Sequence, residues 1–488
     1  MSLIQVTNLT FAYDGSYENI FENASFQIDT NWRLGFTGRN GRGKTTFLNL
    51  LLGKYEYQGS ISASVSFSYF PYHVEDKTIF TIDVVEEIYP EYQYWQLVRE
   101  MNALQLNEEV LYRSFETLSN GEQTKLMLAV LFLKENNFLL IDEPTNHLDI
   151  QGREIVSQYL NSKKGYILVS HDRAFLDGSV DHILSINKAS IDVCRGNFST
   201  WYENKLRQDA FEQAKNEKLK QEVRRLEETA REKAVWSDRV EATKIGFGPC
   251  DRGYIGHKAA KMMARSKAIE KRQQAAIEEK SQLLKNIERI DALKILQTPF
   301  HSKRLVTLRD VTICYDKEPI CEGITFEIQQ GDRIVLQGAN GSGKSSIIKL
   351  ICGEDIPYTG EMRIGKGLSI SYVSQDTSEL RGKLTDFARD SGIDESLFLA
   401  LLAKLDVPKR QMEKDMSSLS AGQKKKVLLA RSICQPTHLH IWDEPMNYID
   451  VISRMQIEEL LLQFKPTILF VEHDKVFCDN IATKVVQL

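Results

Sequence analysis

The chain has 488 residues, enough for two or three domains, and its 42% hydrophobic and 26% charged residues are typical of a globular protein. No apolar run reaches the roughly 18 residues that a membrane-spanning helix needs, and the N-terminus lacks a basic stretch followed by an apolar core, so we expect neither a membrane span nor a signal peptide. The seven cysteines form no CxxC pair, which favours a reducing, cytoplasmic location.

The net charge of −5 is unevenly distributed along the chain. Residues 201–300 carry 22 Lys and Arg against 16 Asp and Glu, whereas the rest of the chain carries 40 against 51. A basic segment inside an acidic chain indicates a polyanionic partner for that segment. A solvated helical hairpin with mixed charges would explain the same count, and charge alone does not decide between them.

The N-terminal region predicts a phosphate-binding loop between a strand and a helix. RLGFT (33–37) has strand character, GRNGRGKT (38–45) fits G-x-x-x-x-G-K-[ST], and the apolar TFLNLLLG follows. The glycines let backbone N–H groups close around phosphate oxygens, Lys44 would reach the β- and γ-phosphates, and Thr45 can ligate Mg²⁺. A glycine-rich turn without a ligand is the weaker alternative, because every fixed position and both flanks match.

A strand that ends in two acids follows downstream. NFLLIDEPTNHLD (137–149) places Asp142 and Glu143 after four apolar residues. Beside a phosphate-binding loop, the first acid would complete the Mg²⁺ shell and the second would polarise the attacking water. Before this strand, LSNGEQ (118–123) precedes a helix, and after it ILVSHD (167–172) ends a strand at His171.

Residues 201–300 predict two antiparallel helices joined by a loop. The segment KIGFGPCDRGYIG (244–256) contains four glycines and one proline, which break the helical pattern. A helix of ~40 residues is ~60 Å long, so this hairpin would project well beyond a compact domain. Each helix carries a narrow apolar stripe: Leu219, Val223, Leu226 and Ala230 in the first, and Leu283, Ile287 and Ile290 in the second.

The motifs of the first half return in the second half at nearly one offset. Between 300 and 302 residues separate the members of each matched pair, which indicates a tandem repeat of one nucleotide-binding domain. The pairs are Tyr13 and Tyr315, Lys44 and Lys344, Ser119 and Ser420, Glu143 and Glu444, and His171 and His473. We therefore expect an α/β chain with domains at 1–200 and 301–488 and a helical hairpin at 201–300.

Together, the phosphate-binding loop, the LSNGEQ or LSAGQ signature, the DEP motif and the switch histidine resemble the ATP-binding-cassette (ABC) ATPases in both halves. The resemblance implies a monomer in which two cassettes pack head to tail, each ATP being held by the phosphate-binding loop of one cassette and the signature of the other. The first site would use the loop at 38–45 with Ser420 and Gly422, and the second site the loop at 338–345 with Ser119 and Gly121.

The resemblance also assigns roles to individual residues. Tyr13 and Tyr315 match the aromatic residue that stacks on adenine, unless they are core residues at strand ends. The implied catalytic residues are Glu143, Glu444, His171 and His473, and the implied Mg²⁺ ligands are Thr45, Asp142, Ser345, Gln375 and Asp443. The implied ATP-binding residues are Tyr13, Gly38, Asn40, Gly41, Gly43, Lys44, Thr45, Thr46, Ser119, Gly121, Tyr315, Gly338, Asn340, Gly341, Gly343, Lys344, Ser345, Ser346, Gln375, Ser420 and Gly422.

Two departures from the family pattern predict that the sites are not equivalent. Gln375 in SYVSQD matches the glutamine that senses Mg²⁺ and the γ-phosphate, but its counterpart in SYFPYH is Tyr72, which cannot replace a carboxamide. The second DEP motif has Met446 and Tyr448 where the first has a threonine and a histidine.

Two cassettes joined by a basic helical hairpin resemble the ABC-F subfamily, and GRNGRGKT, IWDEPMNYID and YIGHKAAKMMARSK (254–267) resemble its Lsa and Vga antibiotic-resistance type. The resemblance implies a ribosome-bound ATPase without a membrane subunit, whose linker meets large-subunit ribosomal RNA and P-site tRNA near the peptidyl-transferase region. It would counteract lincosamide, pleuromutilin or streptogramin A antibiotics. A housekeeping ABC-F factor is an alternative, although the short span before the first signature leaves little room for its arm insertion. The ATPase pair of a membrane transporter and a DNA-associated ABC ATPase are further alternatives.

The linker offers candidate RNA contacts around its tip at 244–257. Residues 238–267 contain seven basic and three acidic residues, and Lys and Arg contacts dominate affinity for nucleic acids. Exposed aromatic residues at the tip could stack on bases, or they could pack the loop on itself. A solvated helix face would equally explain the basic residues. The candidates are Lys244, Phe247, Arg252, Tyr254, Lys258, Lys261, Arg265 and Lys267.

Overall fold

In the computed structural model, the described residues are 2–15, 19–186, 191–242, 297–315 and 318–488, with isolated positions between 261 and 295. Contacts between residues divide the chain into two units. One unit contains both repeats, and the other contains the linker from Thr200 to Arg289 with Asn187–Ser190.

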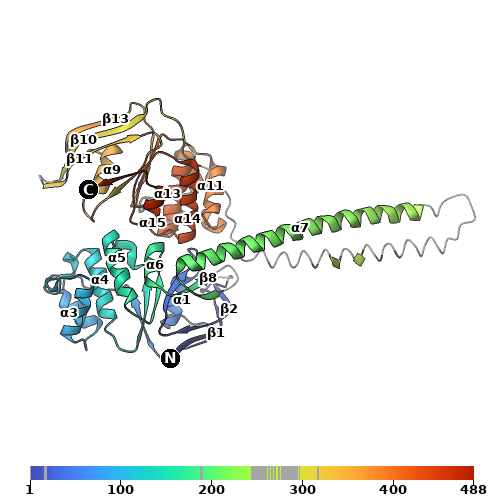
Figure 1. Ribbon diagram of the computed structural model, residues 1–488, viewed down its shortest axis with the longest axis horizontal. Coiled ribbons are helices and arrows are strands. Elements are labelled where there is room, and N and C mark those ends of the chain that lie inside the picture. Colours follow the sequence, from blue (N-terminus) through green and yellow to red (C-terminus); the bar gives the residue numbers. More distant parts are fainter. Residues whose placement is uncertain are drawn as a thin grey trace, which may run out of the picture. The chain divides into compact units, whose positions relative to one another are not determined.

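The described part of the first half forms an antiparallel sheet and a mostly parallel sheet (Figure 1). The antiparallel sheet has the order β2-β1-β4, with β1 at Leu3–Phe11, β2 at Phe21–Asp29 and β4 at Gln58–Ser62. The other sheet has the order β5-β6-β7-β3-β8-β9, in which only the β8–β9 pair is antiparallel. Its strands are β3 (Arg33–Thr37), β5 (Ser66–Phe70), β6 (Asn137–Asp142), β7 (Tyr166–Val169), β8 (His182–Ile186) and β9 (Ile191–Arg195).

The described helices of the first half follow or connect these strands. They are α1 (Lys44–Leu51), α2 (Thr81–Ile88), α3 (Tyr94–Ala103), α4 (Asn120–Leu131), α5 (Ile150–Asn161) and α6 (Arg173–Ser179), with short 3₁₀ turns η1 (Glu108–Tyr112), η2 (Phe115–Thr117) and η3 (Pro144–His147). Residues 72–118, between β5 and α4, form a helical layer that contains α2 and α3.

The second half repeats this plan, which confirms the predicted α/β tandem repeat. Its antiparallel sheet has the order β11-β10-β13, with β10 at Arg304–Tyr315, β11 at Glu318–Gln329 and β13 at Tyr358–Ile364. Its parallel sheet has the order β14-β15-β16-β12-β17, with β12 (Arg333–Gln337), β14 (Ile370–Val373), β15 (Leu439–Asp443), β16 (Ile468–Val471) and β17 (Lys484–Gln487). The described helices are α9 (Lys344–Ile351), α10 (Leu384–Asp390), α11 (Glu395–Lys404), α12 (Lys409–Met412), α13 (Ala421–Cys434), α14 (Val451–Phe464) and α15 (Lys475–Ile481), with a 3₁₀ turn η4 (Met416–Ser418).

The buried parallel strands place the loops that carry the predicted site residues at one edge of the sheet. The side chains of β7 are all buried and those of β3 nearly so, as expected for parallel strands covered on both faces. Phe47 of α1 packs on Phe26 and Phe36, with ring centroids 5.5 and 5.6 Å away. This packing fixes α1 against the sheet. Because parallel strands end at one edge, the loops after β3, β6 and β7 meet there.

The linker begins with α7, which spans Phe198–Ala242 and has 45 residues. At 1.5 Å per residue this helix is about 68 Å long. It contains the first predicted apolar stripe, whose side chains lie outside the described set, as does the whole second stripe. Further along, Lys261 and Lys267 are helical and exposed, whereas the predicted tip at 244–257 lies outside the described residues. In the described part of the chain, no helix is long and apolar enough to cross a membrane. The domain boundaries near 200 and 300 stay predictions.

Candidate nucleotide-binding sites

Both phosphate-binding loops connect a buried strand to a helix, in the context that the motif requires. Residues 38–43 lead from β3 into α1, and residues 338–343 lead from β12 into α9. Gly43 and Gly343 cap these helices with φ of 92° and 86°, a conformation that glycine adopts without strain. A Cβ atom on Gly43 would also collide with Ile20. The N–H groups at the two helix N-termini form the predicted phosphate cradle.

The lysines of the two loops lie inside their own loops. The Lys44 ammonium donates to the carbonyl oxygen of Gly38 at 2.7 Å, and the Lys344 ammonium donates to that of Gly338 at 2.9 Å. Burial lowers the pKa of both lysines, while the carboxylates around them oppose this shift. Each ammonium is thus held at the centre of the loop, where a bound phosphate would meet it.

Hydroxyl and carboxylate oxygens meet at both predicted Mg²⁺ positions. The Thr45 hydroxyl donates to Oδ2 of Asp142 at 2.9 Å, and Ser345 hydrogen-bonds Asp443. Oδ1 of Asp443 is buried and has no hydrogen-bond partner among the described residues. Such oxygens fit Mg²⁺, which usually takes one or two protein ligands and shares the rest with phosphates and water. The described residues contain no cluster of three or more His, Cys, Asp and Glu side chains that would hold a metal alone.

Each predicted catalytic glutamate faces the switch histidine of its own half. Nε2 of His171 lies 3.2 Å from Oε1 of Glu143, and Nε2 of His473 lies 3.6 Å from Oε1 of Glu444. The glutamates have φ of 50° and 46°, in the left-handed region that residues with side chains rarely adopt. Such strained positions cluster at functional sites, because the surrounding fold must hold them.

The two glutamates differ in their ease of ionisation. Burial, followed by the charge of Asp142, raises the pKa of Glu143 to about 8. Burial acts in the same direction on Glu444, but the hydrogen bond and charge of His473 and the charge of Lys425 outweigh it and lower the pKa. At neutral pH, Glu444 is therefore ionised, whereas Glu143 is mostly protonated.

Gln375 after β14 and Tyr72 after β5 occupy equivalent positions but have different hydrogen-bond partners. The amide of Gln375 donates to Oε2 of Glu444 at 2.8 Å, and the amide of Asn447 donates to the same oxygen at 2.6 Å. The Tyr72 hydroxyl donates instead to Glu87 of α2 at 3.1 Å. Gln375 therefore contacts the predicted catalytic acid of its site, whereas Tyr72 contacts the helical layer.

Tyr69, which the motifs did not single out, contacts the first metal position. Its hydroxyl donates to Oδ2 of Asp142 at 3.0 Å, the same oxygen that Thr45 reaches. The sequence offered one signal for this role, because Tyr69 is the penultimate residue of β5 and lies three residues before the divergent Tyr72.

Lys425 is a second residue that the motifs did not single out. Its ammonium donates to the carbonyl oxygens of Ser374 at 2.8 Å and Asp443 at 3.2 Å, so it links the loop after β14 to the end of β15. Burial lowers its pKa to about 8. The signal was a lysine on the buried face of the helix that follows LSAGQ.

The signature helices α4 and α13 begin in the same way. The Ser119 hydroxyl accepts from the N–H of Glu122 at 3.2 Å, and the Ser420 hydroxyl accepts from the N–H of Gln423 at 3.3 Å. The side chains of Glu122 and Gln423 in turn accept a hydrogen bond from the backbone N–H of the serine. These reciprocal bonds form a capping box at the start of each helix. The positive end of each helix dipole favours an anion in front of these serines.

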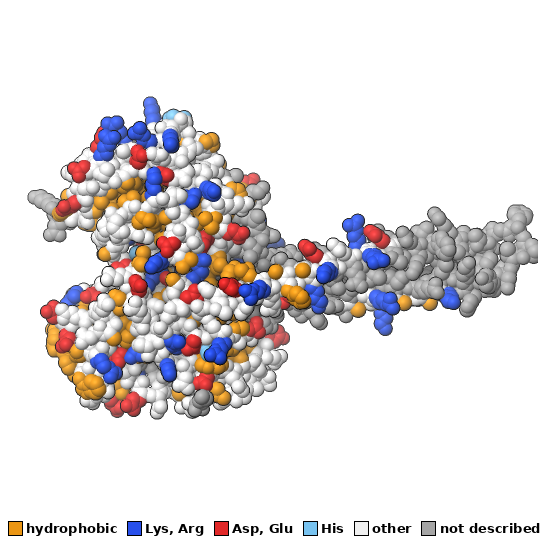
Figure 2. Space-filling model, viewed as in Figure 1, with side chains coloured by type: hydrophobic (Ala, Val, Ile, Leu, Met, Phe, Trp, Pro, Cys, Tyr) orange, Lys and Arg blue, Asp and Glu red, His pale blue; other side chains and the backbone are white. Residues whose placement is uncertain are grey.

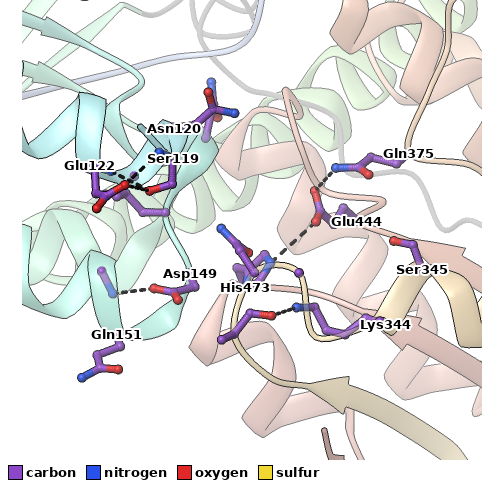
Figure 3. A pocket seen from close by; sticks show the side chains of 18 of the residues that line it. Ser119, Asn120, Glu122, Asp149, Gln151, Lys344, Ser345, Gln375, Glu444 and His473 are labelled. Atoms are coloured by element: carbon purple, nitrogen blue, oxygen red, sulfur yellow. Dashed lines mark hydrogen bonds and ion pairs between the residues drawn. The ribbon is translucent and has the colours of Figure 1, made fainter. Parts of the chain in front are cut away.

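A cavity of about 980 Å³ joins the second phosphate-binding loop to the first signature (Figure 3). Its volume is at the upper end of ordinary ligand sites. In Figure 3, Ser119 and Asn120 lie on one side of the cavity, and Lys344, Glu444 and His473 lie on the other. The predicted residues that line it are Ser119, Gly121, Asn340, Gly341, Gly343, Lys344, Ser345, Ser346, Gln375, Glu444 and His473.

At the first site, the halves touch directly. The Asn40 amide donates to the carbonyl oxygen of Tyr448 at 2.7 Å, and a Cβ atom on Gly422 would collide with that carbonyl. Arg42 lies 3.8 Å from Asp406. Each phosphate-binding loop thus meets the signature region of the other half.

Tyr13 and Tyr315 occupy equivalent positions. The Tyr13 hydroxyl lies 2.8 Å from Oγ1 of Thr46, and the Tyr315 hydroxyl donates to Oγ of Ser346 at 3.4 Å. The two rings are 42% and 39% exposed, so neither is a core residue. Both rings are partly exposed beside a phosphate-binding loop, and the Tyr13 ring also packs in T-shaped geometry with Phe11 and Tyr55. Stacking on adenine stays a prediction.

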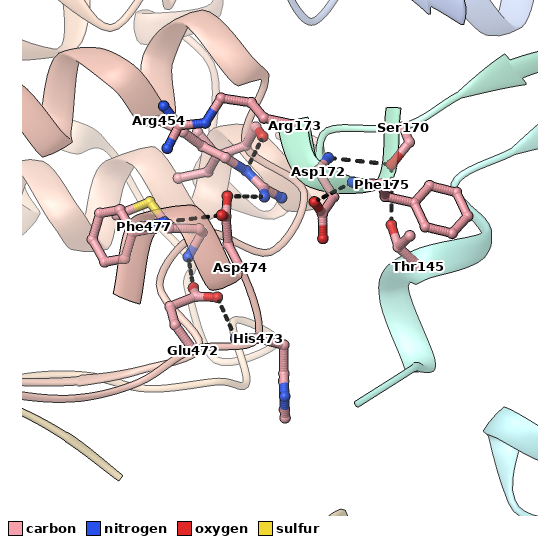
Figure 4. A network of polar contacts seen from close by, with 12 residues as sticks. Thr145, Ser170, Asp172, Arg173, Phe175, Arg454, Glu472, His473, Asp474 and Phe477 are labelled. Carbon is pink, nitrogen blue, oxygen red and sulfur yellow. Dashed lines mark hydrogen bonds and ion pairs between the residues drawn. The ribbon is translucent and has the colours of Figure 1, made fainter. Parts of the chain in front are cut away.

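The switch loops of the two halves rest on different partners (Figure 4). In the first half, the hydroxyls of Thr145 and Ser170 lie 3.2 Å apart. Met446 and Glu472 replace them in the second half, where Glu472 accepts from the N–H of Met446 at 2.7 Å and from the N–H of His473 at 3.0 Å. Burial raises the pKa of Glu472. This carboxyl therefore ties the second switch loop to the loop that carries Tyr448.

One ion pair between the halves has no symmetric counterpart. Arg173 of α6 pairs with Glu458 of α14, which also accepts from the Asn480 amide at 2.6 Å. By the repeat offset, Lys475 is the equivalent of Arg173 and Ser157 is the equivalent of Glu458. Both Lys475 and Ser157 line a separate cavity of about 380 Å³. Only the first arrangement buries a salt bridge.

The predicted RNA contacts of the linker remain predictions. Lys261 and Lys267 are exposed on a helix, and the other candidates lie outside the described residues. Figure 2 shows Lys and Arg side chains interspersed with acids on the described part of α7.

Comparisons with known proteins agree with this geometry. The family model described as ABC transporter matches residues 21–146 and 321–447. The ribosome protection protein VmlR of Bacillus subtilis (strain 168) is 27% identical over 486 residues, covering 98% of this chain and 85% of that protein. The ATP-binding protein Uup of Buchnera aphidicola (subsp. Acyrthosiphon pisum, strain APS) is 28% identical over 520 residues, covering 99% and 80%.

Among solved structures, the archaeal ribosome recycling factor aABCE1, in complex with the ribosomal stalk protein aP1, is similar in fold. Its TM-score is 0.63 at 19% identity, over 98% of this chain and 87% of that chain. The paired phosphate-binding loops, signatures, acids and switch histidines, together with a family match to both halves, lead to one conclusion. The chain belongs to the ABC transporter family, as an ATPase with two tandem cassettes.

Proposed function

We propose that this ATPase protects the bacterial type of ribosome from antibiotics in the cytoplasm, without a membrane subunit. ATP at both sites closes the cassettes of one monomer, and the closed form directs the linker into the exit site of the large subunit. There the linker meets ribosomal RNA and P-site tRNA and protects the peptidyl-transferase region from lincosamide, pleuromutilin or streptogramin A antibiotics. Hydrolysis removes the contacts that closed the cassettes and releases the protein.

The observation that carries this proposal is a tie between the first site and the start of α7. His171 directly precedes Asp172, the N-cap residue of α6, and Asp177 lies on that short helix. The Asp177 carboxylate accepts from the N–H of Ser199 at 2.8 Å and also from its hydroxyl. In the proposed cycle, a shift of the switch loop would move α6 and, through the Asp177 carboxylate, the first turn of α7.

The chain's own residues account for the ATPase steps. A nucleotide in the 980 Å³ cavity contacts Lys344 and His473 of one half and Ser119 of the other, so its binding favours the closed form. Glu444, with its lowered pKa, accepts a proton from the attacking water. Mg²⁺, held by residues such as Ser345 and Asp443, would neutralise charge on the phosphates.

Co-sedimentation with ribosomes tests the ribosome step. Changing Glu143 and Glu444 together to Gln removes the proton acceptors but leaves the phosphate-binding loops intact. We expect this variant to accumulate on ribosomes in the presence of ATP, whereas Lys44→Ala combined with Lys344→Ala does not. Equal recovery of both variants with ribosomes would contradict the ATP-driven cycle.

A housekeeping ABC-F translation factor is the second candidate, because the likeness to Uup is as strong as the likeness to VmlR. Expression in a drug-susceptible host separates the two. Resistance predicts lower susceptibility to at least one lincosamide, pleuromutilin or streptogramin A, and the Glu143→Gln, Glu444→Gln double variant serves as the control. Unchanged susceptibility to all three classes would favour the housekeeping role.

A further inference from the structure

An exposed aromatic surface lies on the helical layer of the first half, away from the residues of the nucleotide sites. We define the aromatic face as Phe80, Tyr94, Trp95 and Tyr112, whose exposed fractions are 58%, 44%, 61% and 65%. Figure 2 shows orange side chains gathered over the region where Figure 1 labels α3, with acidic side chains around them. Large aromatic side chains are normally drawn into cores, so a group left exposed indicates a binding surface.

The members of the aromatic face are joined by side-chain contacts and short chain connections. The hydroxyls of Tyr94 and Tyr112 lie 3.4 Å apart, and Tyr94 also donates to Glu108 at 3.3 Å. Trp95 follows Tyr94 on α3, and Phe80 pairs through its backbone with Ser114, two residues after Tyr112. The residues of the aromatic face are therefore carried by α3, η1 and the residue before α2, segments that contact one another.

The surroundings of the aromatic face are strongly acidic. Residues 72–118 contain ten Asp and Glu against three Lys and Arg. Such a charge repels the phosphates of RNA and attracts cationic groups. The face already holds one example of the preferred contact, because the Arg99 guanidinium lies 5.6 Å from the centre of the Trp95 ring.

The equivalent layer of the second half lacks these features. Residues 375–419 contain nine Asp and Glu against seven Lys and Arg, and their two aromatic residues are Phe387 and Phe398. Phe398 is fully buried, and Phe387 packs on the core that contains it. The helical layer of the second half folds without exposed aromatic rings and with only a small excess of acids. Folding therefore does not explain these two features of the first half, and binding of a partner would.

We propose that the aromatic face is a docking surface for a cationic segment of another protein. Arg or Lys side chains of that segment stack on Trp95 and Tyr112, and neighbouring carboxylates such as Glu108 hold their charge. The proposal goes beyond the proposed ribosome cycle and does not depend on it, because the surface is complete without the linker or ATP.

Fluorescence anisotropy with the full-length chain tests this proposal. The probe is a fluorescein-labelled peptide of alternating Arg and Gly, and its counterpart of alternating Glu and Gly controls for charge. We expect binding of the Arg peptide alone, and a loss of about tenfold in affinity in the Trp95→Ala, Tyr112→Ala double variant, because hot-spot aromatic residues carry much of such binding. Leu397→Ala, at an exposed position (39%) on α11 of the second half, should leave the affinity unchanged.

ATPase activity serves as the folding control, because the aromatic face lies outside both sites. Equal affinity of the double variant and the wild type would overturn the proposal, since acidic charge alone would then hold the peptide. A second measurement places a photo-crosslinking amino acid at Phe80 and mixes the chain with the Arg peptide or with single-stranded RNA. Crosslinks to the peptide support the proposal, and crosslinks to the RNA alone, or none at all, overturn it.

Discussion

The two halves of this chain share one fold but hold their predicted catalytic acids in different states. Glu444 receives amide donors from Gln375 and Asn447 and has a lowered pKa. Oε1 of Glu143 is buried without a hydrogen-bond partner among the described residues, and its pKa is raised to about 8. The comparison teaches that the protonation of each acid follows its burial and the charges and donors around it, which the motif alone does not specify.

The same comparison extends to the contacts between the halves. The second site contains a large cavity lined by both halves, whereas at the first site Asn40 bonds directly to the Tyr448 carbonyl. Tyr448 lies in the same loop as Met446, and the Glu472 side chain links that loop to the second switch loop by accepting from the N–H groups of Met446 and His473. The two sites are therefore in contact, so a change at one is expected to alter the other.

The largest expected effect concerns the buried ion pair between the halves. Arg173→Ala leaves the Glu458 carboxylate buried without its charge partner, which costs about 3 kcal/mol in comparable cases. We expect a matching fall in the free energy of unfolding, measured by urea titration. Lys475→Ala, at the equivalent position of the other half, should change it by less than about 0.5 kcal/mol. Similar losses of unfolding free energy in both variants would contradict the predicted difference between the two sides.

Single substitutions of the glutamates give the next largest effect. At pH 7, a carboxyl with a pKa of about 8 is ionised in about one molecule in ten, so we expect the first site to hydrolyse ATP more slowly than the second. Glu444→Gln should therefore lower steady-state ATP hydrolysis about tenfold or more, and Glu143→Gln by less than about twofold. A larger loss in Glu143→Gln would reverse the comparison.

The pH dependence of these variants sharpens the same point. Glu143 is protonated below its pKa and accepts a proton only above it, so hydrolysis by Glu444→Gln should rise several-fold as the pH passes through about 8. Glu444 has a lowered pKa and is already ionised, so hydrolysis by Glu143→Gln should stay flat through neutral pH. Parallel pH profiles would show that the two acids have similar surroundings.

The smallest effect concerns Gln375 and Tyr72. In the Glu143→Gln background, Gln375→Ala removes a hydrogen bond that positions Glu444 and should lower hydrolysis a few-fold, about 1 kcal/mol for one hydrogen bond. Tyr72→Ala in the Glu444→Gln background should have almost no effect, because its hydroxyl contacts Glu87. The measurement compares the ATPase rates of Glu143→Gln and Glu444→Gln, each with and without its second substitution. An equal fall caused by Gln375→Ala and by Tyr72→Ala would contradict the prediction.

Much of the fold could be predicted from local patterns. The phosphate-binding loops, strand-end acids and switch histidines were recognised because their chemistry needs fixed residue types at fixed spacing. The repeat offset predicted the second half, and the order of its parallel strands matches that of the first. The β9 strand was not predicted, because its short, half-exposed sequence lacks a clear alternation. The aromatic face was also missed, because exposure depends on packing.

By itself, the sequence determined that two ATPase cassettes share this chain and that their sites differ at Tyr72 and Gln375. Only the tertiary structure decided what those differences do. It turned Tyr72 toward Glu87 and brought Tyr69 to Asp142, over distances that sequence spacing does not encode. The pKa of a buried acid depends on the donors and charges within a few ångströms, and these come from segments far apart in the chain.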